Sequence, residues 1–371
     1  MDIGEGFPIV PPGGSIGIVG GGQLGRMMAA AASRIGLSAH IYADAPGSPA
    51  SFVAASTCMG SFDDTHALSG FAAGVDVLTY EFENVPAGPL ASLALEGVAV
   101  APNVEVLRVA QDRLIEKTFA NELGAVTAPF RQIDSPADIV AAARDIGGPT
   151  ILKTRRLGYD GKGQVRLPSI DDGLDATAAD DAWREVAGAP CILEGMIDFD
   201  CEISIIGARG RNGEIAIYDA PRNVHRGGIL RTSIVPANVP SRSIKAGRQI
   251  VTDLLERLDY VGVIAVEFFV QTNGDLLVNE LAPRVHNSGH WTEDACVTGQ
   301  FEQHIRAVAG WPLGSTRRFA NAEMINLIGD DVATWRDHAA DPFACVRLYG
   351  KDVARAGRKM GHVTRLVPIG G

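Results

Sequence analysis

The sequence is poor in lysine and cysteine, and it contains no long apolar run. The five cysteines are scattered without a CxxC pair, at Cys58, Cys191, Cys201, Cys296 and Cys345. This spacing excludes the usual paired zinc ligands and a disulfide framework, and it is typical of reduced thiols. No apolar stretch approaches the roughly 20 residues that a membrane-spanning helix needs, and the first residues lack the basic-then-apolar order of a signal peptide. We therefore expect a cytoplasmic protein without membrane partners.

Acidic residues outnumber basic ones, which gives a formal net charge of -11. This balance argues against nucleic acid or anionic membranes as partners, although a local basic pocket is compatible with it. Only six of the 33 basic residues are lysines, so arginine is the default cation. A retained lysine then indicates a site that needs a compact point charge. Four of the six lie in the motifs described below, namely Lys153, Lys162, Lys351 and Lys359.

Short apolar strands alternate with helical patterns over the first hundred residues. Strands are expected at Ser15–Val19, His40–Asp44 and Val75–Tyr80, and apolar residues at helical spacing follow the first of them. Such alternation predicts a doubly wound parallel sheet. A helical stretch from about Val104 to Leu123 is expected to bridge into the next domain.

From Thr150 onward the strands come in hairpins, which predicts an α+β arrangement. Strands are expected at Thr150–Thr154, Gln164–Leu167, Cys191–Leu193, Glu202–Ala208, Glu214–Asp219, Val261–Val270 and Leu276–Leu281, with a helix at Leu174–Ala187. Beyond Trp311, short strands at Met324–Ile328 and Val346–Tyr349 precede a stretch punctuated by proline and glycine. The fold class is therefore α/β combined with α+β.

Residues Gly20 to Gly25 match G-x-G-x-x-G between a strand and a helix, and Asp44 follows about 20 residues later. These are the features of a dinucleotide-binding fingerprint. They favour an NAD-dependent oxidoreductase as one interpretation. The other interpretation is close packing, because glycines also serve a tight strand-to-helix turn in any α/β fold.

The dipeptide Asn273-Gly274 separates two β-branched runs and predicts a hairpin. A two-residue turn would pair Thr272 with Asp275, and counting outward pairs Glu267 with Glu280. Two carboxylates that face each other lie about 5 Å apart at Cβ and repel. A fold keeps such a pair mainly when a cation lies between them, and Mg²⁺ suits one or two carboxylates plus phosphates. The alternative is a solvated hairpin whose register differs by one residue.

The segment from Lys153 to Gln164 contains three glycines, two lysines and two arginines between two expected strands. Backbone N–H groups at glycines can approach an oxyanion closely, and the side chains supply positive charge. A Walker-A turn must open a helix, which this segment does not. We interpret it as a flap over nucleotide phosphates. A mobile basic hairpin is the alternative.

These motifs resemble the ATP-grasp superfamily, and within it the 5-(carboxyamino)imidazole ribonucleotide synthetases of purine biosynthesis. The resemblance runs from about Ile16 to His362, and its most specific part is Asn279 to Trp291, which reads NELAPRVHNSGHW. Gly-Gly-Gln-Leu-Gly-Arg, Gly-Tyr-Asp-Gly-Lys-Gly-Gln, Gly-Ile-Leu-Arg-Thr-Ser and Gly-Arg-Lys-Met-Gly-His are its other motifs. Leu157 departs from the family pattern, because many relatives have glycine there. The chain also stops soon after His362, where relatives usually continue.

The resemblance implies an ATP-grasp fold with three domains. They are a Rossmann-like pre-ATP-grasp domain over 1–112, an ATP-grasp domain over 113–312 with a flap part at about 125–195, and a small, short β-rich domain over 313–371. The implied reaction is the ATP- and bicarbonate-dependent carboxylation of aminoimidazole ribonucleotide through carboxyphosphate. Small-molecule substrates, Mg²⁺ and a homodimer are implied as well.

The resemblance also assigns roles to individual residues. For ATP they are Arg113, Lys153, Gly158, Tyr159, Asp160, Gly161, Lys162, Gly163, Gln164, Glu194, Gly195, Met196, Ile197, Glu202, His225, Asn279 and Glu280. For the ribonucleotide they are Gln23, Leu24, Glu81, Tyr159, Asp160, Arg284, His286, Asn287, Ser288, Lys351 and Arg358. Asp160, Lys351 and Arg284 are the catalytic candidates, with Asp160 as a candidate proton acceptor. Glu267 and Glu280 are the expected metal ligands.

Other functions remain open at this point. A formate-dependent glycinamide ribonucleotide transformylase or a biotin carboxylase would share the flap, but the His-Asn-Ser-Gly-His stretch speaks against them. An oxidoreductase leaves the flap and the Glu267/Glu280 pair unexplained. A non-catalytic nucleotide-binding regulator is disfavoured, because the carboxylates and flap lysines are present. His290 and Trp291 fit a core role as well as a substrate role.

Overall fold

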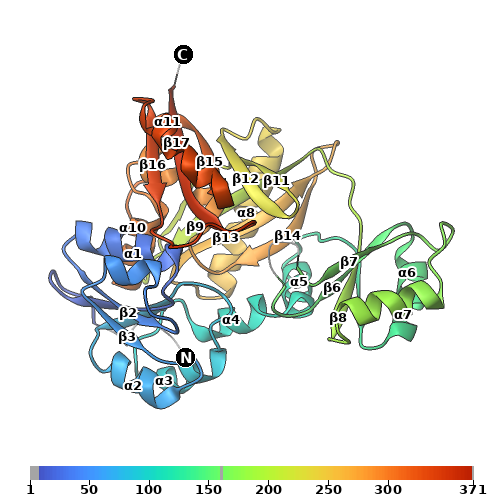
Figure 1. Cartoon of the computed structure of the whole chain (residues 1–371), viewed down its shortest axis with the longest axis horizontal. Helices are drawn as coiled ribbons and strands as arrows, with labels where there is room; N and C mark the ends of the chain where they lie inside the picture. Colours follow the sequence, from blue (N-terminus) through green and yellow to red (C-terminus); the bar gives the residue numbers. More distant parts are fainter. Residues whose placement is uncertain (1–7, 159–161, 370–371) are drawn as a thin grey trace.

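The computed structural model describes residues 8–158 and 162–369, and its strands form three sheets (Figure 1). The N-terminal sheet lies at one corner of the body, and the largest sheet runs through the rest of the body. The third sheet belongs to a lobe that stands apart at the right of Figure 1. Parallel and antiparallel sheets thus occur in one chain, which confirms the expected mixture of α/β and α+β structure. Within the described residues, no helix is both long and apolar enough to cross a membrane.

The N-terminal sheet is parallel throughout, with the strand order β3-β2-β1-β4. The observed bounds of the first strand equal the predicted ones, and those of β2 and β4 differ by one or two residues. The strands are β1 (Ser15–Val19), β2 (Ser38–Ala43), β3 (Ser56–Met59) and β4 (Val77–Tyr80), and the helices are α1 (Gln23–Arg34), α2 (Thr65–Ala72) and α3 (Ala87–Leu95). The short 3-10 helix η2 spans Pro49–Phe52. This arrangement brings the ends of β1 and β4 together beside the glycine-rich turn.

The bridge to the next domain consists of two helices, α4 (Val104–Ala110) and α5 (Arg113–Glu122). The prediction of one helix from 104 to 123 was therefore wrong. The break occurs because Asp112 adopts an extended backbone and caps α5, where its side chain accepts the N–H of Leu114 at 3.0 Å. The break also starts α5 at Arg113, four residues before Lys117, so these two cations share one face of the helix.

The separate lobe contains an antiparallel sheet with the order β5-β8-β6-β7, covered by two helices. Its elements are β5 (Phe130–Ile133), β6 (Thr150–Thr154), β7 (Gln164–Leu167), β8 (Cys191–Gly195), α6 (Pro136–Ile146) and α7 (Ala176–Glu185). Strands β6 and β7 have the predicted bounds and pair as a hairpin, so the glycine-rich segment forms the connection between them.

The largest sheet has the order β14-β13-β9-β11-β12-β15-β17-β16, with β10 beside β9. Its strands are β9 (Cys201–Arg209), β10 (Ile215–Ile217), β11 (Arg222–Arg226), β12 (Ile229–Val235), β13 (Gly262–Val270), β14 (Leu276–Ala282), β15 (Ala320–Ile328), β16 (Ala344–Leu348) and β17 (Lys359–Pro368). The helices are α8 (Ser241–Arg257), α9 (Thr292–Ala295), α10 (Gln300–Val308) and α11 (Trp335–Ala339), with 3-10 turns η3 (Asn287–Gly289) and η4 (Gly329–Thr334).

The last three strands extend this same sheet, because β15 pairs with β12. Strand β17 was not predicted, since the proline and glycine residues near it suggested irregular chain. It forms because Lys359 to Pro368 finds partners on both sides, β15 on one and β16 on the other. The C-terminal segment is therefore a continuation of the sheet that carries the acidic hairpin.

The acidic hairpin has the predicted pairing of Glu267 with Glu280, although two intermediate steps were wrong. The loop has three residues, because Gln271 rather than Thr272 pairs with Asp275, and Gly274 takes a φ of +81°. The register then shifts between Glu267 and Phe268, which leaves Asn279 as an extra residue on β14. The longer loop and the bulge shift the register in opposite directions, so the two carboxylates still face each other.

Helix α10 joins the N-terminal domain to the largest sheet through His304. Its Nε2 lies 2.8 Å from the Thr79 hydroxyl on β4, and its Nδ1 accepts the N–H of Val263 on β13 at 3.1 Å. Because Nδ1 accepts a backbone N–H, the ring proton lies on Nε2 and points to Thr79. His304 is fully buried, and burial lowers its pKa to about 4. The two domains are thus joined by a neutral imidazole.

This neutral imidazole predicts a loss of stability in mild acid. Between pH 6.5 and about 4 the unfolded chain binds a proton that folded His304 does not, so the free energy of unfolding falls as the pH falls. The contribution of this group is up to about 3 kcal/mol. Urea unfolding at pH 7 and pH 4.5 should show a smaller fall for His304→Gln than for wild type. The exposed His66→Gln is the control, and an equally steep fall in His304→Gln would refute the account.

Candidate active site

Glu267 and Glu280 form the centre of the site. Glu267 is almost completely buried, and burial together with the charge of Glu280 raises its pKa to about 8. A cation lies on one side of the pair, since Arg113 is 3.7 Å from Glu280, and the neutral ring of His286 lies on the other, with Nε2 3.6 Å from Glu267. Two oxygen ligands that repel each other in this way are a donor set suited to Mg²⁺. The residues present therefore fit the expected metal, with phosphate and water oxygens completing its ligands.

A buried carboxylate, Glu194, connects two lysines beside this pair. Its Oε2 lies 3.0 Å from Lys153 Nζ on β6 and 3.3 Å from Lys117 Nζ on α5. Burial opposes ionisation, but the two ammonium charges and that of Arg113 prevail and lower the pKa of Glu194 to about 2. Lys117 also donates to the carbonyl of Asn279, the bulged residue, at 3.1 Å. Lys117 thereby connects the flap lobe to the acidic hairpin, through its ion pair with Glu194 and its hydrogen bond to Asn279.

The flap connection approaches Arg113, whose guanidinium donates to the carbonyl of Gly158 at 3.2 Å. Lys162 and Gly163 lead into β7, where Gln164 pairs with Lys153. Tyr159, Asp160 and Gly161 lie outside the described residues. Leu157 has a φ of +63°, in the left-handed region that favours glycine, which gives a physical reason for the glycine found in many relatives.

Glu81 directly follows β4, and its side chain lies against the glycine-rich turn at the start of α1. Its carboxylate accepts the N–H groups of Gly22 and Leu24, the latter at 3.0 Å. Burial raises the pKa of Glu81, while these backbone donors and Arg284 act in the opposite direction. A Cβ on Gly20 would come within 2.6 Å of the Glu81 side chain, and one on Gly22 within 2.3 Å. The glycines thus make room for an internal anion where a pyrophosphate would lie, which speaks against the dinucleotide interpretation.

Arg284 forms a two-pronged ion pair with Glu83, in which Nη2 donates to Oε1 at 3.0 Å and Nε donates to Oε2. Burial opposes the ionisation of Glu83, but the charge and hydrogen bonds of Arg284 lower its pKa. Pairing with an acid is a common role of an arginine, and it is the arrangement observed here. The ribonucleotide-binding role that the resemblance implies for Arg284 stays a prediction.

The segment after Arg284 is held by a buried hydrogen-bond network. His286 Nδ1 lies 2.8 Å from the Ser288 hydroxyl, which lies 2.6 Å from that of Ser204. Burial, then the charges of Arg284, Lys359 and His225, keep the pKa of His286 well below its ordinary value. Ser288 is fully buried, which favours positioning over direct substrate contact. Asn287 exchanges two hydrogen bonds with Asn326, at 2.9 and 2.7 Å.

His290 and Trp291, whose roles the sequence left open, are both fully buried in the core.

The remaining predicted residues come from several different elements. Glu202 on β9 pairs with His225 on β11, and the charges of Glu267 and Glu280 help to raise the pKa of His225 against the effect of burial. Gly195 ends β8, and Met196 and Ile197 follow it. Gln23 and Leu24 open α1. Arg358 donates to the carbonyl of Val353 at 2.9 Å, within its own loop.

Sequence reasoning missed several residues that complete the site. Lys117 is 1% exposed. Lysine is rare in this chain, so a lysine four residues after Arg113 was a usable signal. Glu116 accepts the N–H of Leu281, and burial raises its pKa to about 8. Glu83 and Asp112 left no pattern, because their partners Arg284 and Arg155 lie far away in the sequence.

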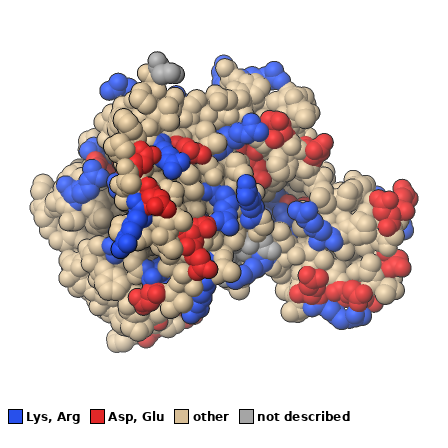
Figure 2. Space-filling model, turned by 45° about the horizontal axis from the view of Figure 1, so that its top comes forward, with Lys and Arg blue, Asp and Glu red and all other residues tan. Residues whose placement is uncertain are grey.

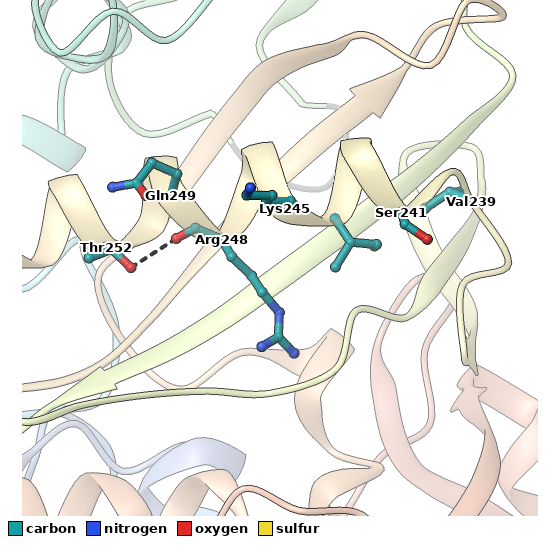
Figure 3. A pocket seen from close by; sticks show the side chains of 7 residues that line it. Val239, Ser241, Lys245, Arg248, Gln249 and Thr252 are labelled. Carbon is teal, nitrogen blue, oxygen red and sulfur yellow. Dashed lines mark hydrogen bonds between the residues drawn. The ribbon is translucent and has the colours of Figure 1, made fainter.

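The surface is hollowed where the flap lobe meets the body, and basic side chains lie along this hollow (Figure 2). A different groove, of about 420 Å³, runs along the outer face of α8 and is lined by Val239, Ser241, Ile244, Lys245, Arg248, Gln249 and Thr252 (Figure 3). It shares no residue with the acidic centre. Arg248 in this groove is already paired with Asp219 at 3.1 Å. We therefore assign the site to the acidic hairpin and not to the groove.

Comparison with known proteins covers nearly the whole chain. Family models match for the ribonucleotide synthetase preATP-grasp domain at 14–111, the ATP-grasp domain at 118–301 and the phosphoribosylaminoimidazole carboxylase C-terminal domain at 322–368. The chain is 52% identical over 357 residues to N5-carboxyaminoimidazole ribonucleotide synthase of Brucella melitensis, which covers 96% of this chain and 97% of that relative.

Two solved structures are similar throughout. The ADP complex of an N5-carboxyaminoimidazole ribonucleotide synthetase has a TM-score of 0.91 and 38% identity, covering 96% of this chain and 93% of that one. The Aspergillus clavatus enzyme in complex with ADP and 5-aminoimidazole ribonucleotide has a TM-score of 0.87 and 28% identity, covering 96% and 94%. These similarities confirm the expected ATP-grasp fold with its N-terminal and C-terminal domains.

The Glu194 bridge yields a prediction about stability. Glu194→Gln leaves the buried ammonium groups of Lys117 and Lys153 without their counter-charge, which should cost about 3–5 kcal/mol. Because the folded pKa is about 2, wild type loses this contribution as the pH falls from about 4.5 toward 2, and the variant should show a shallower loss. Guanidinium unfolding at stepped pH measures both effects. The exposed Glu185→Gln in the same lobe is the control; a cost below about 1 kcal/mol with an unchanged acid slope contradicts the prediction.

Proposed function

Because the chain belongs to the N5-carboxyaminoimidazole ribonucleotide synthase family, we propose that it carboxylates 5-aminoimidazole ribonucleotide with ATP and bicarbonate. The observation that carries the proposal is the facing pair Glu267 and Glu280 with Arg113 and Lys153 beside it, in a chain that keeps the His-Asn-Ser segment next to that pair. The products are 5-(carboxyamino)imidazole ribonucleotide, ADP and phosphate, and the reaction is a step of purine synthesis.

The ATP phosphates would lie between the flap lobe and the acidic hairpin. Lys153 and Arg113 extend into this region from β6 and α5, and each already contacts a carboxylate of the site. Phosphoryl transfer depends chiefly on positioning and charge neutralisation, which such cations supply. Residues Glu194 to Ile197 would contact adenine, and Glu202 with His225 would contact the ribose. Asn279 would assist the phosphates from the bulge next to Glu280.

Glu267 and Glu280 would hold Mg²⁺, which would supply positive charge to neutralise the phosphate during its transfer. The raised pKa of Glu267 supports this assignment, because a neighbouring cation would relieve the repulsion that raises it. Neutral His286, 3.6 Å from Glu267, accompanies the pair without adding a charge at neutral pH.

The reaction proceeds in two transfers. A bicarbonate oxygen attacks the γ-phosphorus of ATP, ADP leaves, and carboxyphosphate forms. The exocyclic amine then attacks the carboxyl carbon, the C–O bond to phosphate breaks, and the amine loses a proton. Asp160 is the candidate acceptor of that proton. Because carboxyphosphate reacts readily with water, the flap must close over it.

The ribonucleotide would lie between the N-terminal domain and the acidic hairpin. Gln23, Leu24 and Glu81 stand at the carboxyl ends of β1 and β4, where open α/β sheets bind ligands. Tyr159, Asp160, Arg284, His286, Asn287, Lys351 and Arg358 would complete the pocket, and buried Ser288 would position His286. The five free thiols support a reducing compartment such as the cytoplasm. We propose a homodimer by analogy with the family.

The function is tested by measuring ADP release from ATP, Mg²⁺ and bicarbonate with and without 5-aminoimidazole ribonucleotide. The ribonucleotide should accelerate ADP release, and labelled bicarbonate should enter the ribonucleotide in equal amount to the ADP formed. Glycinamide ribonucleotide with formate is the comparison substrate. Equal acceleration by that pair, or ADP release without label transfer, would move the assignment to another ligase.

Arg284 provides a second test, at the level of substrate recognition. If it binds the 5′-phosphate, Arg284→Lys should raise KM for the ribonucleotide tenfold or more, because a charge-assisted hydrogen bond is worth about 1.5–3 kcal/mol and lysine cannot bind with two prongs. KM for ATP should stay within twofold. Glu83→Gln should raise KM for the ribonucleotide less than Arg284→Lys does, because it leaves the guanidinium in place and only weakens its hydrogen bonds to residue 83.

The dephosphorylated nucleoside is the control for this prediction. Wild type and Arg284→Lys should use it equally poorly. If Arg284→Lys leaves KM for the ribonucleotide unchanged and only lowers stability, then Arg284 serves Glu83 alone.

A further inference from the structure

Lys351 makes specific contacts beside the hairpin of β16 and β17. Its Nζ donates to the carbonyl of Lys359 at 2.7 Å and lies 5.5 Å from the centroid of the Tyr349 ring. A cation within about 6 Å of an aromatic face is attracted by the ring. Lysine has a flexible four-carbon stem, so such contacts help to fix where its ammonium group lies. Tyr349 directly follows β16, and its N–H donates to Met360 on β17 at 3.0 Å.

The Tyr349 ring is itself fixed by buried neighbours. Only 1% of the residue is exposed, and its hydroxyl lies 2.8 Å from Nδ1 of His362, which is fully buried. Burial raises the pKa of Tyr349 and lowers that of His362 to about 3, so both groups are neutral at pH 7. The contact is therefore an ordinary hydrogen bond that sets the orientation of the ring.

A second imidazole links this pair to the acidic hairpin. The rings of His362 and His290 pack with centroids 4.7 Å apart. The side chain of Gln300 donates to His290 Nδ1 at 3.1 Å and to the His286 carbonyl at 2.7 Å, and it accepts the His286 N–H at 2.9 Å. Gln300 is fully buried, and His286 lies next to Glu267. Buried side chains in mutual contact therefore connect Glu267, an expected metal ligand, to the Tyr349 ring next to Lys351.

We propose that Tyr349 is a positioning residue that holds the Lys351 ammonium in the ribonucleotide pocket, with His362 and His290 fixing Tyr349 relative to the acidic hairpin. This inference rests on the proposed function, because it takes Lys351 as a group of that pocket. It gives a role to His290, in the most specific motif of the chain, and to His362, in the Gly-Arg-Lys-Met-Gly-His motif.

A double-mutant cycle between Tyr349 and Lys351 tests the proposal. Tyr349→Leu removes the ring and the hydroxyl, and kcat/KM for the ribonucleotide should fall tenfold or more while KM for ATP stays within twofold. Tyr349→Phe keeps the ring, and its loss should be about threefold or less. In a Lys351→Ala background, Tyr349→Leu should cause almost no further loss, because the residue acts through the lysine.

Tyr218→Phe is the matched control, since Tyr218 is also fully buried and donates its hydroxyl to Thr298 at 3.0 Å. It should leave kcat/KM within twofold. If Tyr349→Leu does not fold, the same cycle is measured with Tyr349→Met, which also removes the ring but fills much of the space. Equal fold losses with and without Lys351 would overturn the proposal, as would an unchanged kcat/KM in Tyr349→Leu. Failure of the proposed function is distinguishable, because wild type itself would then show no turnover dependent on the ribonucleotide.

Discussion

Two carboxylates on neighbouring strands repel each other, and the other charged residues of the site compensate for this repulsion. Glu267 and Glu280 face each other across β13 and β14, and burial together with this repulsion raises the pKa of Glu267 to about 8. Such a pair is costly without nearby positive charge. Arg113 lies 3.7 Å from Glu280 and relieves only one side. A cation placed between the two carboxylates would therefore make the arrangement more favourable.

The compensating charges come from elements that are far apart in the sequence. Arg113 and Lys117 come from α5, and Lys153 comes from β6 in the separate lobe (Figure 1). Glu194 joins the two lysines and so keeps their positions relative to the hairpin fixed. The site consequently depends on how the lobe and the body are placed, and a change at Glu194 should affect the Glu267/Glu280 pair, 70 or more residues away in the sequence.

Local patterns in the sequence predicted much of this fold, because strand periodicity and turn residues act over short distances. The bounds of β1, β6 and β7 were predicted correctly, and so was the pairing of Glu267 with Glu280. The bulge at Asn279 left no local signal, and the correct pairing was reached because a longer loop offset it. Glu83 was missed because its partner is 201 residues away, and only three-dimensional packing brings the two together.

The most direct test of the central claim is the stability of the metal-free protein at pH 9, above the pKa of Glu267. Removing one charge in Glu280→Gln should make the metal-free protein more stable than wild type, because the repulsion is gone. Adding Mg²⁺ with a non-hydrolysable ATP analogue at about 100 times Kd should stabilise wild type by about 2.7 kcal/mol and the variant far less. A variant that is less stable without metal and gains as much as wild type with it would contradict the account.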